Sequence, residues 1–170
     1  MSLMQRLQDL GYPSNTLLKR HRMYPGLPQP SSEWFCGSRL LDARMTWSGS
    51  RAQKFRIHMN YRHDKSLTVS RYAIHLNYGN NLIGLGKCPF HPLNVSHAMA
   101  LIENLVANEI FLPWEIAFII LYLAQEGEYR KSFIARADEP VWKVEGRDIW
   151  QARLETIDSM QGNQAPLVLL

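Results

Sequence analysis

The sequence has few cysteines, no long apolar run and no secretory leader. Cys36 and Cys88 are too few for a disulfide framework. No charged and apolar leader opens the chain, so we expect a cytoplasmic protein, compatible with peripheral-membrane or virion association, rather than a secreted one. The apolar stretch at residues 110–124 has only 15 residues and contains Glu115, whereas a membrane span needs about 20 apolar residues. We therefore expect this stretch to lie in the core.

Motifs of common catalytic sites are also missing. The phosphate-binding loop, the G-x-S-x-G nucleophile turn, the H-E-x-x-H zinc helix and the dinucleotide glycine pattern do not occur. Carboxylates are scarce in the first half of the chain, where Asp42 and Asp64 lie far apart in sequence. These absences disfavour an enzyme and predict no cofactor.

One cysteine and two histidines have a spacing that raises the question of zinc. Cys88, His91 and His97 form C-x2-H-x5-H, and Cys36 is a conceivable fourth ligand. Structural zinc sites usually have tighter paired spacings and more cysteines, so we predict no metal site and a buried Cys88 beside a loop histidine. A nucleophilic Cys36 is a weaker hypothesis, because no second signature element surrounds it.

Charge is distributed unevenly along the chain. Residues 1–91 hold 13 Lys and Arg against 4 Asp and Glu, a net charge of +9, and residues 92–170 hold 6 against 11, a net charge of −5. The first half therefore attracts anions.

The basic half contains an alternating segment, K-F-R-I-H-M-N-Y-R at residues 54–62. A period of two predicts a strand with Phe55, Ile57, Met59 and Tyr61 on its core face and a basic opposite face. Such a face suits phosphates of RNA or lipid headgroups, and the alternative is a solvated sheet face. The predicted anion-binding residues are Lys54, Arg56, His58, Arg62, Arg71, His75, Arg44, Lys19, Arg20 and Arg22.

The predicted fold is α+β, with an antiparallel sheet of three to five strands packed against two or three helices and a flexible Pro-containing N-terminal arm. Strands are expected at residues 40–47, 54–62, 67–78, 82–85, 129–135 and 141–144, and helices at 96–109, 113–127 and 147–160. The predicted organisation is an N-terminal helix and arm at 1–38, one domain at 39–162 and a tail at 163–170. No internal repeat is visible.

The arm contains two further patterns. Leu3, Leu7 and Leu10 have helical spacing before Gly11, which predicts a short helix that docks on this chain or on a second copy. Tyr24, Pro25 and Leu27 fit Y-P-x-L, and Tyr12, Pro13 and Leu17 fit its longer-spaced form, the late-domain motifs that recruit host membrane-scission machinery. The alternative is a Pro-containing linker with two aromatic residues.

Taken together, the basic arm with Y-P-x-L, the β region with residues 54–62 and two helices separated by a proline resemble the layout of rhabdovirus matrix proteins over residues 12–135. The chain lacks P-P-x-Y and a long Lys-rich N-terminus. The resemblance implies a non-enzymatic viral structural protein that self-associates and binds ribonucleoprotein and the inner leaflet of a membrane. The alternatives are an RNA-binding or host-factor-binding regulator, such as a silencing suppressor or anti-defence protein, and a cysteine- or zinc-dependent enzyme.

Overall fold

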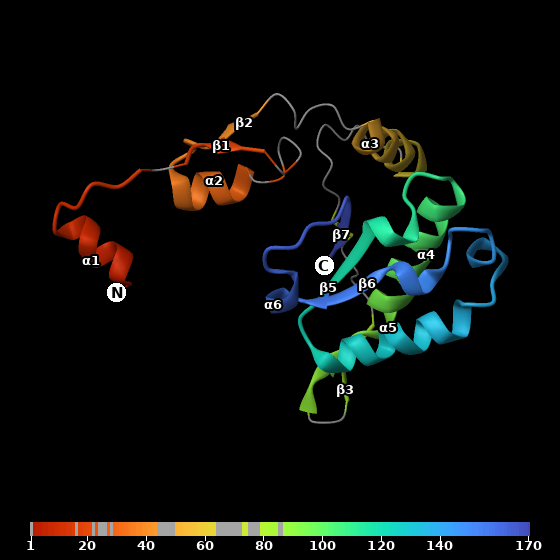
Figure 1. Ribbon diagram of the computed structural model, residues 1–170. Helices are drawn as coiled ribbons and strands as arrows, with labels where there is room; N and C mark the ends of the chain where they lie inside the picture. Colours follow the sequence, from red (N-terminus) through yellow and green to blue (C-terminus); the bar gives the residue numbers. More distant parts are fainter. Residues whose placement is uncertain are drawn as a thin grey trace. The chain divides into compact units, whose positions relative to one another are not determined.

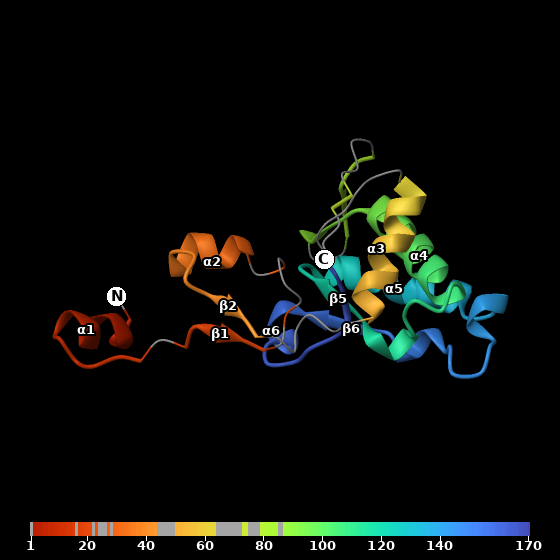
Figure 2. The ribbon, with the colours of Figure 1, turned by 90° about the horizontal axis from the view of Figure 1, so that it is seen from above.

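The computed structural model describes residues 2–15, 17–21, 23, 27, 29–43, 50–63, 73–74, 79–84 and 87–170. The chain divides into two compact units, Met1–Arg71 and Tyr72–Leu170 (Figures 1 and 2). Each unit is described separately below.

The described residues of the first unit form three helices and one pair of very short strands. In chain order these elements are α1 (Leu3–Asp9), β1 (Lys19–Arg20), α2 (Gln29–Cys36), β2 (Leu41–Asp42) and α3 (Ser50–His63). The predicted N-terminal helix is confirmed as α1, which begins where the Ser2 hydroxyl accepts a hydrogen bond from the Gln5 amide. It ends before Gly11, whose φ of 79° lies in the left-handed region that glycine adopts without strain.

The predicted strand at residues 54–62 is wrong, because this segment belongs to helix α3. Phe55 and Met59 are buried, as both interpretations require, since positions four apart share a face in a strand and in a helix. Ile57 and Tyr61 decide between them: a strand would bury both, but they are 62% and 91% exposed. Most of the segment from Arg51 onward also consists of residues with good helix propensity.

The first described elements of the second unit are the antiparallel strands β3 (Leu82–Ile83) and β4 (Pro89–Phe90), and α4 (Pro92–Ala107) follows them. The helix predicted at residues 96–109 is confirmed as α4. Pro92 occupies its first turn, where no backbone donor is needed, and His91 caps it. The predicted apolar stripe is buried at each of its positions, Met99, Ile102, Leu105, Val106 and Ile110.

A three-stranded parallel sheet forms the centre of this unit, in the order β6-β5-β7. After a short 3-10 turn, η3 (Pro113–Glu115), the chain enters β5 (Ile116–Ile120) and then α5 (Leu123–Arg136). It returns as β6 (Arg153–Thr156), α6 (Ile157–Met160) and β7 (Leu167–Leu169), with η4 (Pro140–Trp142) and η5 (Ile149–Gln151) before β6. The antiparallel sheet that the sequence analysis predicted is therefore wrong: this sheet is parallel, as is the β1–β2 pair.

The main error was the assignment of residues 113–127 to one helix. The segment I-A-F-I-I forms β5, and four of its five residues are buried. A parallel strand covered on both faces reads as an unbroken apolar run, which periodicity does not distinguish from a buried helix. The expectation that residues 110–124 lie in the core is confirmed for most of residues 110–120 and is wrong for Leu121, Tyr122 and Leu123, which are 71%, 50% and 71% exposed.

The strand predicted at residues 129–135 and the helix predicted at residues 147–160 are also wrong. Residues 129–135 are helical within α5, which continues through Gly127 instead of stopping there. An internal glycine costs about 1 kcal/mol relative to alanine, and burial of Tyr129 and Phe133 at i, i+4 spacing offsets this cost. The helix predicted at 147–160 is replaced by η5, β6 and the four-residue α6.

An aromatic cluster joins α5 to the sheet. The ring of Phe118 on β5 lies 4.9 Å from that of Tyr129 and 5.9 Å from that of Phe133, and Phe133 also contacts Trp150 edge to face. Offset and edge-to-face pairs of this kind add roughly 0.5–1.5 kcal/mol each beyond burial. The cluster fixes α5 against one face of the sheet, beside α4 (Figures 1 and 2).

Candidate functional site

Helix α3 concentrates the positive charge of the described part of the first unit. Its fourteen residues include Arg51, Lys54, Arg56 and Arg62 and no acid. Arg51 and Lys54 are exposed, and His58 follows Lys54 by four residues. Positions 51, 54, 58 and 61 share one side of a helix, so Tyr61 extends this stripe as an aromatic end. We call Arg51, Lys54, His58 and Tyr61 the basic stripe.

Helical geometry redistributes the residues that the sequence analysis assigned to one basic sheet face. Lys54 and His58 stay together, whereas Arg56 lies partly buried beside the stripe of Phe55 and Met59. Arg62 belongs to the last turn of α3. The predicted contributions of Arg44, Arg71, His75 and Arg22 fall on residues outside the described ones.

The basic cluster of the arm is only partly available as charge. Lys19 is exposed in β1, but Arg20 is half-buried and its Nη2 lies 2.7 Å from Oδ1 of Asp42 on the neighbouring strand. Parallel pairing aligns Arg20 with Asp42 directly. This ion pair balances the Arg20 charge, so Lys19 is the stronger candidate for an anion contact.

Two exposed aromatic residues escaped the sequence analysis. Trp34 and Phe35 lie next to each other on α2 and are 77% and 81% exposed. The prolines of this segment predict a flexible arm, in which no exposed helix face is expected. An adjacent Trp-Phe pair within a basic region was the signal that could have identified them.

The late-domain and self-association residues lie on exposed chain where the structure describes them. Tyr12 and Leu17 are 61% and 88% exposed, Pro13 is exposed, and Leu27 is exposed as well. Tyr24 and Pro25 lie outside the described residues. Leu3 on α1 and Leu10, directly after it, are exposed, and Leu7 is half-buried.

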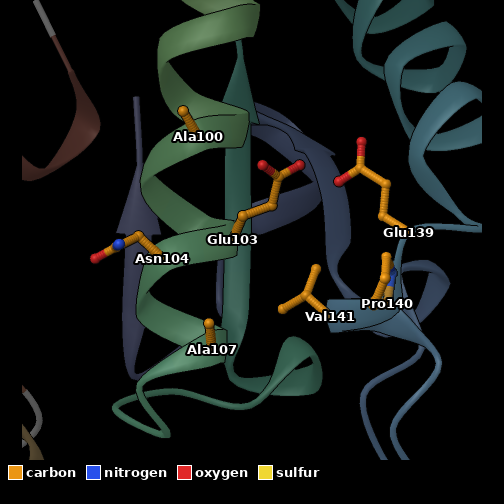
Figure 3. A pocket seen from close by; sticks show the side chains of 7 residues that line it. All are labelled: Ala100, Glu103, Asn104, Ala107, Glu139, Pro140 and Val141. Atoms are coloured by element: carbon orange, nitrogen blue, oxygen red, sulfur yellow. The ribbon is translucent and has the colours of Figure 1, made fainter.

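One hollow of the second unit contains two facing carboxylates. It has a volume of about 450 Å³ and is lined by Ala100, Glu103, Asn104, Ala107, Glu139, Pro140 and Val141 (Figure 3). Nη1 of Arg136, at the end of α5, forms an ion pair with Oε1 of Glu103. Burial raises the pKa of Glu103, with a further rise from the neighbouring Glu139, although Arg136 acts in the opposite direction.

A second hollow, also of about 450 Å³, lies at the carboxyl ends of the parallel strands. Ile119 is near the end of β5, Ile157 and Asp158 follow β6, and Leu170 follows β7. Met160 and Gln161 complete the lining. Ligands of open parallel α/β sheets characteristically bind outside these strand ends. We call this site the carboxyl-edge hollow.

The Cys88 and His91 region is organised by backbone contacts. Nδ1 of His91 accepts a hydrogen bond from the Asn94 amide at 3.3 Å, and Nδ1 of His97 lies 2.8 Å from the carbonyl oxygen of Leu93. Cys36 and Cys88 are both partly exposed, so the expected burial of Cys88 is incomplete. Among the described residues, no three His, Cys, Asp or Glu side chains gather closely enough to hold a metal ion.

Comparison with protein-family models and with curated proteins finds no match to the chain. Within the described ranges, no helix has both the length and the apolar character needed to cross a bilayer.

Proposed function

We propose that the chain binds nucleic acid, with RNA as its first candidate ligand, through the basic stripe of α3. The observation that supports this most is the asymmetry of the helix: Phe55 and Met59 are buried, while Arg51 and Lys54 are exposed in an element without any acid. Phosphates are attracted to a helix that carries several cations and no acid. Tyr61, 91% exposed, adds a ring on which a base can stack.

The same helix is less suited to a membrane surface. An interfacial helix inserts a broad apolar face into the headgroup region. Phe55 and Met59, the apolar stripe of α3, are already buried within the protein. The exposed apolar side chains of this helix are then only Ile57 and Tyr61. This distribution favours a polyanion over a bilayer.

The matrix-like role, with self-association, inner-leaflet binding and recruitment of scission machinery, stays a hypothesis. Its support is reduced, because the resemblance relied on an antiparallel β region whose segment 54–62 is helical. Self-association through α1 is still supported by the exposed Leu3 and Leu10. Light scattering of the full chain, with and without RNA, tests self-association. A protein that stays monomeric at high concentration, both with and without RNA, would exclude it.

RNA binding is tested by charge reversal with a matched control. Arg51→Glu with Lys54→Glu changes the net charge by the same amount as Lys131→Glu with Lys143→Glu, two exposed lysines of the second unit. Fluorescence anisotropy with a labelled RNA, measured across a salt series, gives the affinity and its salt dependence. Loss of two phosphate contacts should reduce the slope of log K against log salt by about 1.4.

The expected result is weaker binding for the α3 variant and nearly unchanged binding for the control. Equal weakening of both variants would mean that net charge alone governs binding, and the interface would be rejected. Wild-type protein that binds no RNA even at low salt would reject the proposed function.

A second candidate function is binding of a nucleotide in the carboxyl-edge hollow. The supporting observation is its place at the ends of all three parallel strands, where Asp158 and Gln161 add polar groups to an apolar lining. In this proposal the base packs on Ile119 and Ile157, and Asp158 accepts hydrogen bonds from ribose hydroxyls.

A fluorescent ATP analogue, competed with unlabelled ATP, tests the second candidate. Ile157→Arg places a long charged chain at the hollow, whereas Val144→Arg introduces the same residue at a similarly exposed position outside its lining. We expect at least about a tenfold rise in Kd for Ile157→Arg alone, equivalent to about 1.4 kcal/mol. Identical affinities in the two variants would contradict this site.

A further inference from the structure

Helix α2 presents two adjacent aromatic rings to solvent. Trp34 and Phe35 expose 77% and 81% of their surface, far more than the aromatic rings of Phe118 and Phe133 in the second unit. Neighbouring positions on a helix point about 100° apart, so the two rings face separate directions. Each therefore offers its own π-face to a ligand.

The helix is anchored on the side opposite Trp34. Ser32 is only 5% exposed, its hydroxyl accepts a hydrogen bond from the Leu40 amide, and its carbonyl accepts one from the Ser38 amide at 2.9 Å. Trp34 follows Ser32 by two positions, about 200° around the helix. The anchored Ser32 and the exposed Trp34 thus lie on opposite sides of α2. Helix α2 itself lies beside the β1–β2 pair (Figure 2).

Two exposed cations lie on the segments that adjoin this helix. Lys19 on β1 is exposed, and so is Arg39, whose Nε donates a hydrogen bond to the Cys36 carbonyl at the end of α2. The Arg20–Asp42 ion pair is internally balanced. Glu33 is the acid on α2, so the two exposed cations outnumber it.

We propose that α2 and the β1–β2 pair form a stacking platform for unpaired bases of single-stranded nucleic acid, with Trp34 and Phe35 stacking on bases and Lys19 and Arg39 contacting phosphates. Aromatic rings beside cations are the usual means of holding single strands without reading their sequence. A phosphate backbone complements the positive charge of Lys19 and Arg39. A purely apolar protein partner would leave these two cations without a complementary charge. The inference rests on the proposed nucleic-acid binding and adds a preference for unpaired strands.

Two probes and three variants test the platform in the full-length protein. A labelled poly(U) strand and an RNA duplex of equal length are titrated by anisotropy at the same salt concentration. Trp34→Ala removes the ring, Trp34→Phe keeps a smaller ring, and Trp114→Ala removes a half-exposed tryptophan of the second unit as control. Circular dichroism of each variant verifies that it is folded.

Wild-type protein should bind the single strand more tightly than the duplex, because paired bases do not expose their faces. Trp34→Ala should weaken single-strand binding roughly 5- to 150-fold, the effect expected for one lost stacking contact, and leave duplex binding unchanged. Trp34→Phe should retain most of the affinity. Trp114→Ala should behave as wild type.

Three results would overturn the platform. The platform would be rejected if the protein bound single strand and duplex equally well and Trp34→Ala changed neither affinity. The proposed function would still stand in that case if charge reversal at Arg51 and Lys54 weakened RNA binding. A change in oligomeric mass by light scattering, without a change in RNA affinity, would assign Trp34 to a protein contact. Absence of RNA binding by the wild type would reject both proposals together.

Discussion

Alanine substitutions along α3 distinguish its helical form from an alternating strand, and the orientation of the basic stripe depends on that distinction. Phe55 and Met59 are 7% and 0% exposed, whereas Ile57 and Tyr61 are 62% and 91% exposed. In a strand all four would be equivalent. The helix therefore predicts two costly substitutions and two nearly silent ones.

The magnitudes follow from burial. Truncation of a buried methionine to alanine costs about 2–5 kcal/mol, and truncation of a buried phenylalanine about 3–5 kcal/mol. Exposed positions without special contacts change stability by roughly 0.5 kcal/mol or less. The loss of unfolding free energy should thus be several times larger for Met59→Ala and Phe55→Ala than for Ile57→Ala and Tyr61→Ala.

Urea unfolding monitored by far-ultraviolet circular dichroism measures the difference. With an m value of about 1–3 kcal/mol/M, Met59→Ala should lower the urea midpoint by about 1 M or more. Tyr61→Ala should change the wild-type midpoint by only about a few tenths of 1 M. Equal destabilisation by Ile57→Ala and Met59→Ala would refute the helical register. The placement of Lys54 and Tyr61 on one exposed side would then fail as well.

Other predictions concern the second unit. Burial raises the pKa of Tyr129 to about 12, so stability should be complete below the usual tyrosine pKa of 10 and fall as pH rises toward 12, with a late absorbance change at 295 nm that Tyr129→Phe removes. Burial and Glu139 raise the pKa of Glu103 above 4.5 despite Arg136; stability should therefore fall as pH rises through this raised value, and urea midpoints of Glu103→Gln should vary less with pH there. Phe133→Ala, at a position 1% exposed, should cost about 3–5 kcal/mol in urea unfolding. A loss below 1 kcal/mol would contradict its place in the aromatic cluster.

The sequence predicted a helix correctly where the spacing of its own apolar residues fits a helix and no strand. The spacing of Met99, Ile102, Leu105 and Val106 predicted α4 correctly, since no strand places these residues on one face. The spacing of Leu3 and Leu7 and the stop at Gly11 likewise predicted α1 correctly. In both helices the periodicity and the end residues agree with the tertiary environment.

Ambiguous patterns were resolved only by packing. Positions 55 and 59 share a face in either structure, so the burial of Phe55 and Met59 is compatible with a helix and a strand, and the exposure of Ile57 and Tyr61 depends on what surrounds the segment. The run at residues 116–120 is apolar at every position, which carries no period at all. Parallel pairing with β6 and β7 made it a strand.

The sequence by itself determined the charge division between the two halves, the positions of α1 and α4, and the burial of most of residues 110–120, because composition and single-helix periodicity do not depend on distant partners. Only the tertiary structure decided that the alternating segment is a helix, that the sheet is parallel, that Asp42 balances Arg20, and that Trp34 and Phe35 face solvent. The parallel sheet and the Arg20–Asp42 ion pair are set by contacts between residues far apart in sequence, and no local pattern encodes such contacts.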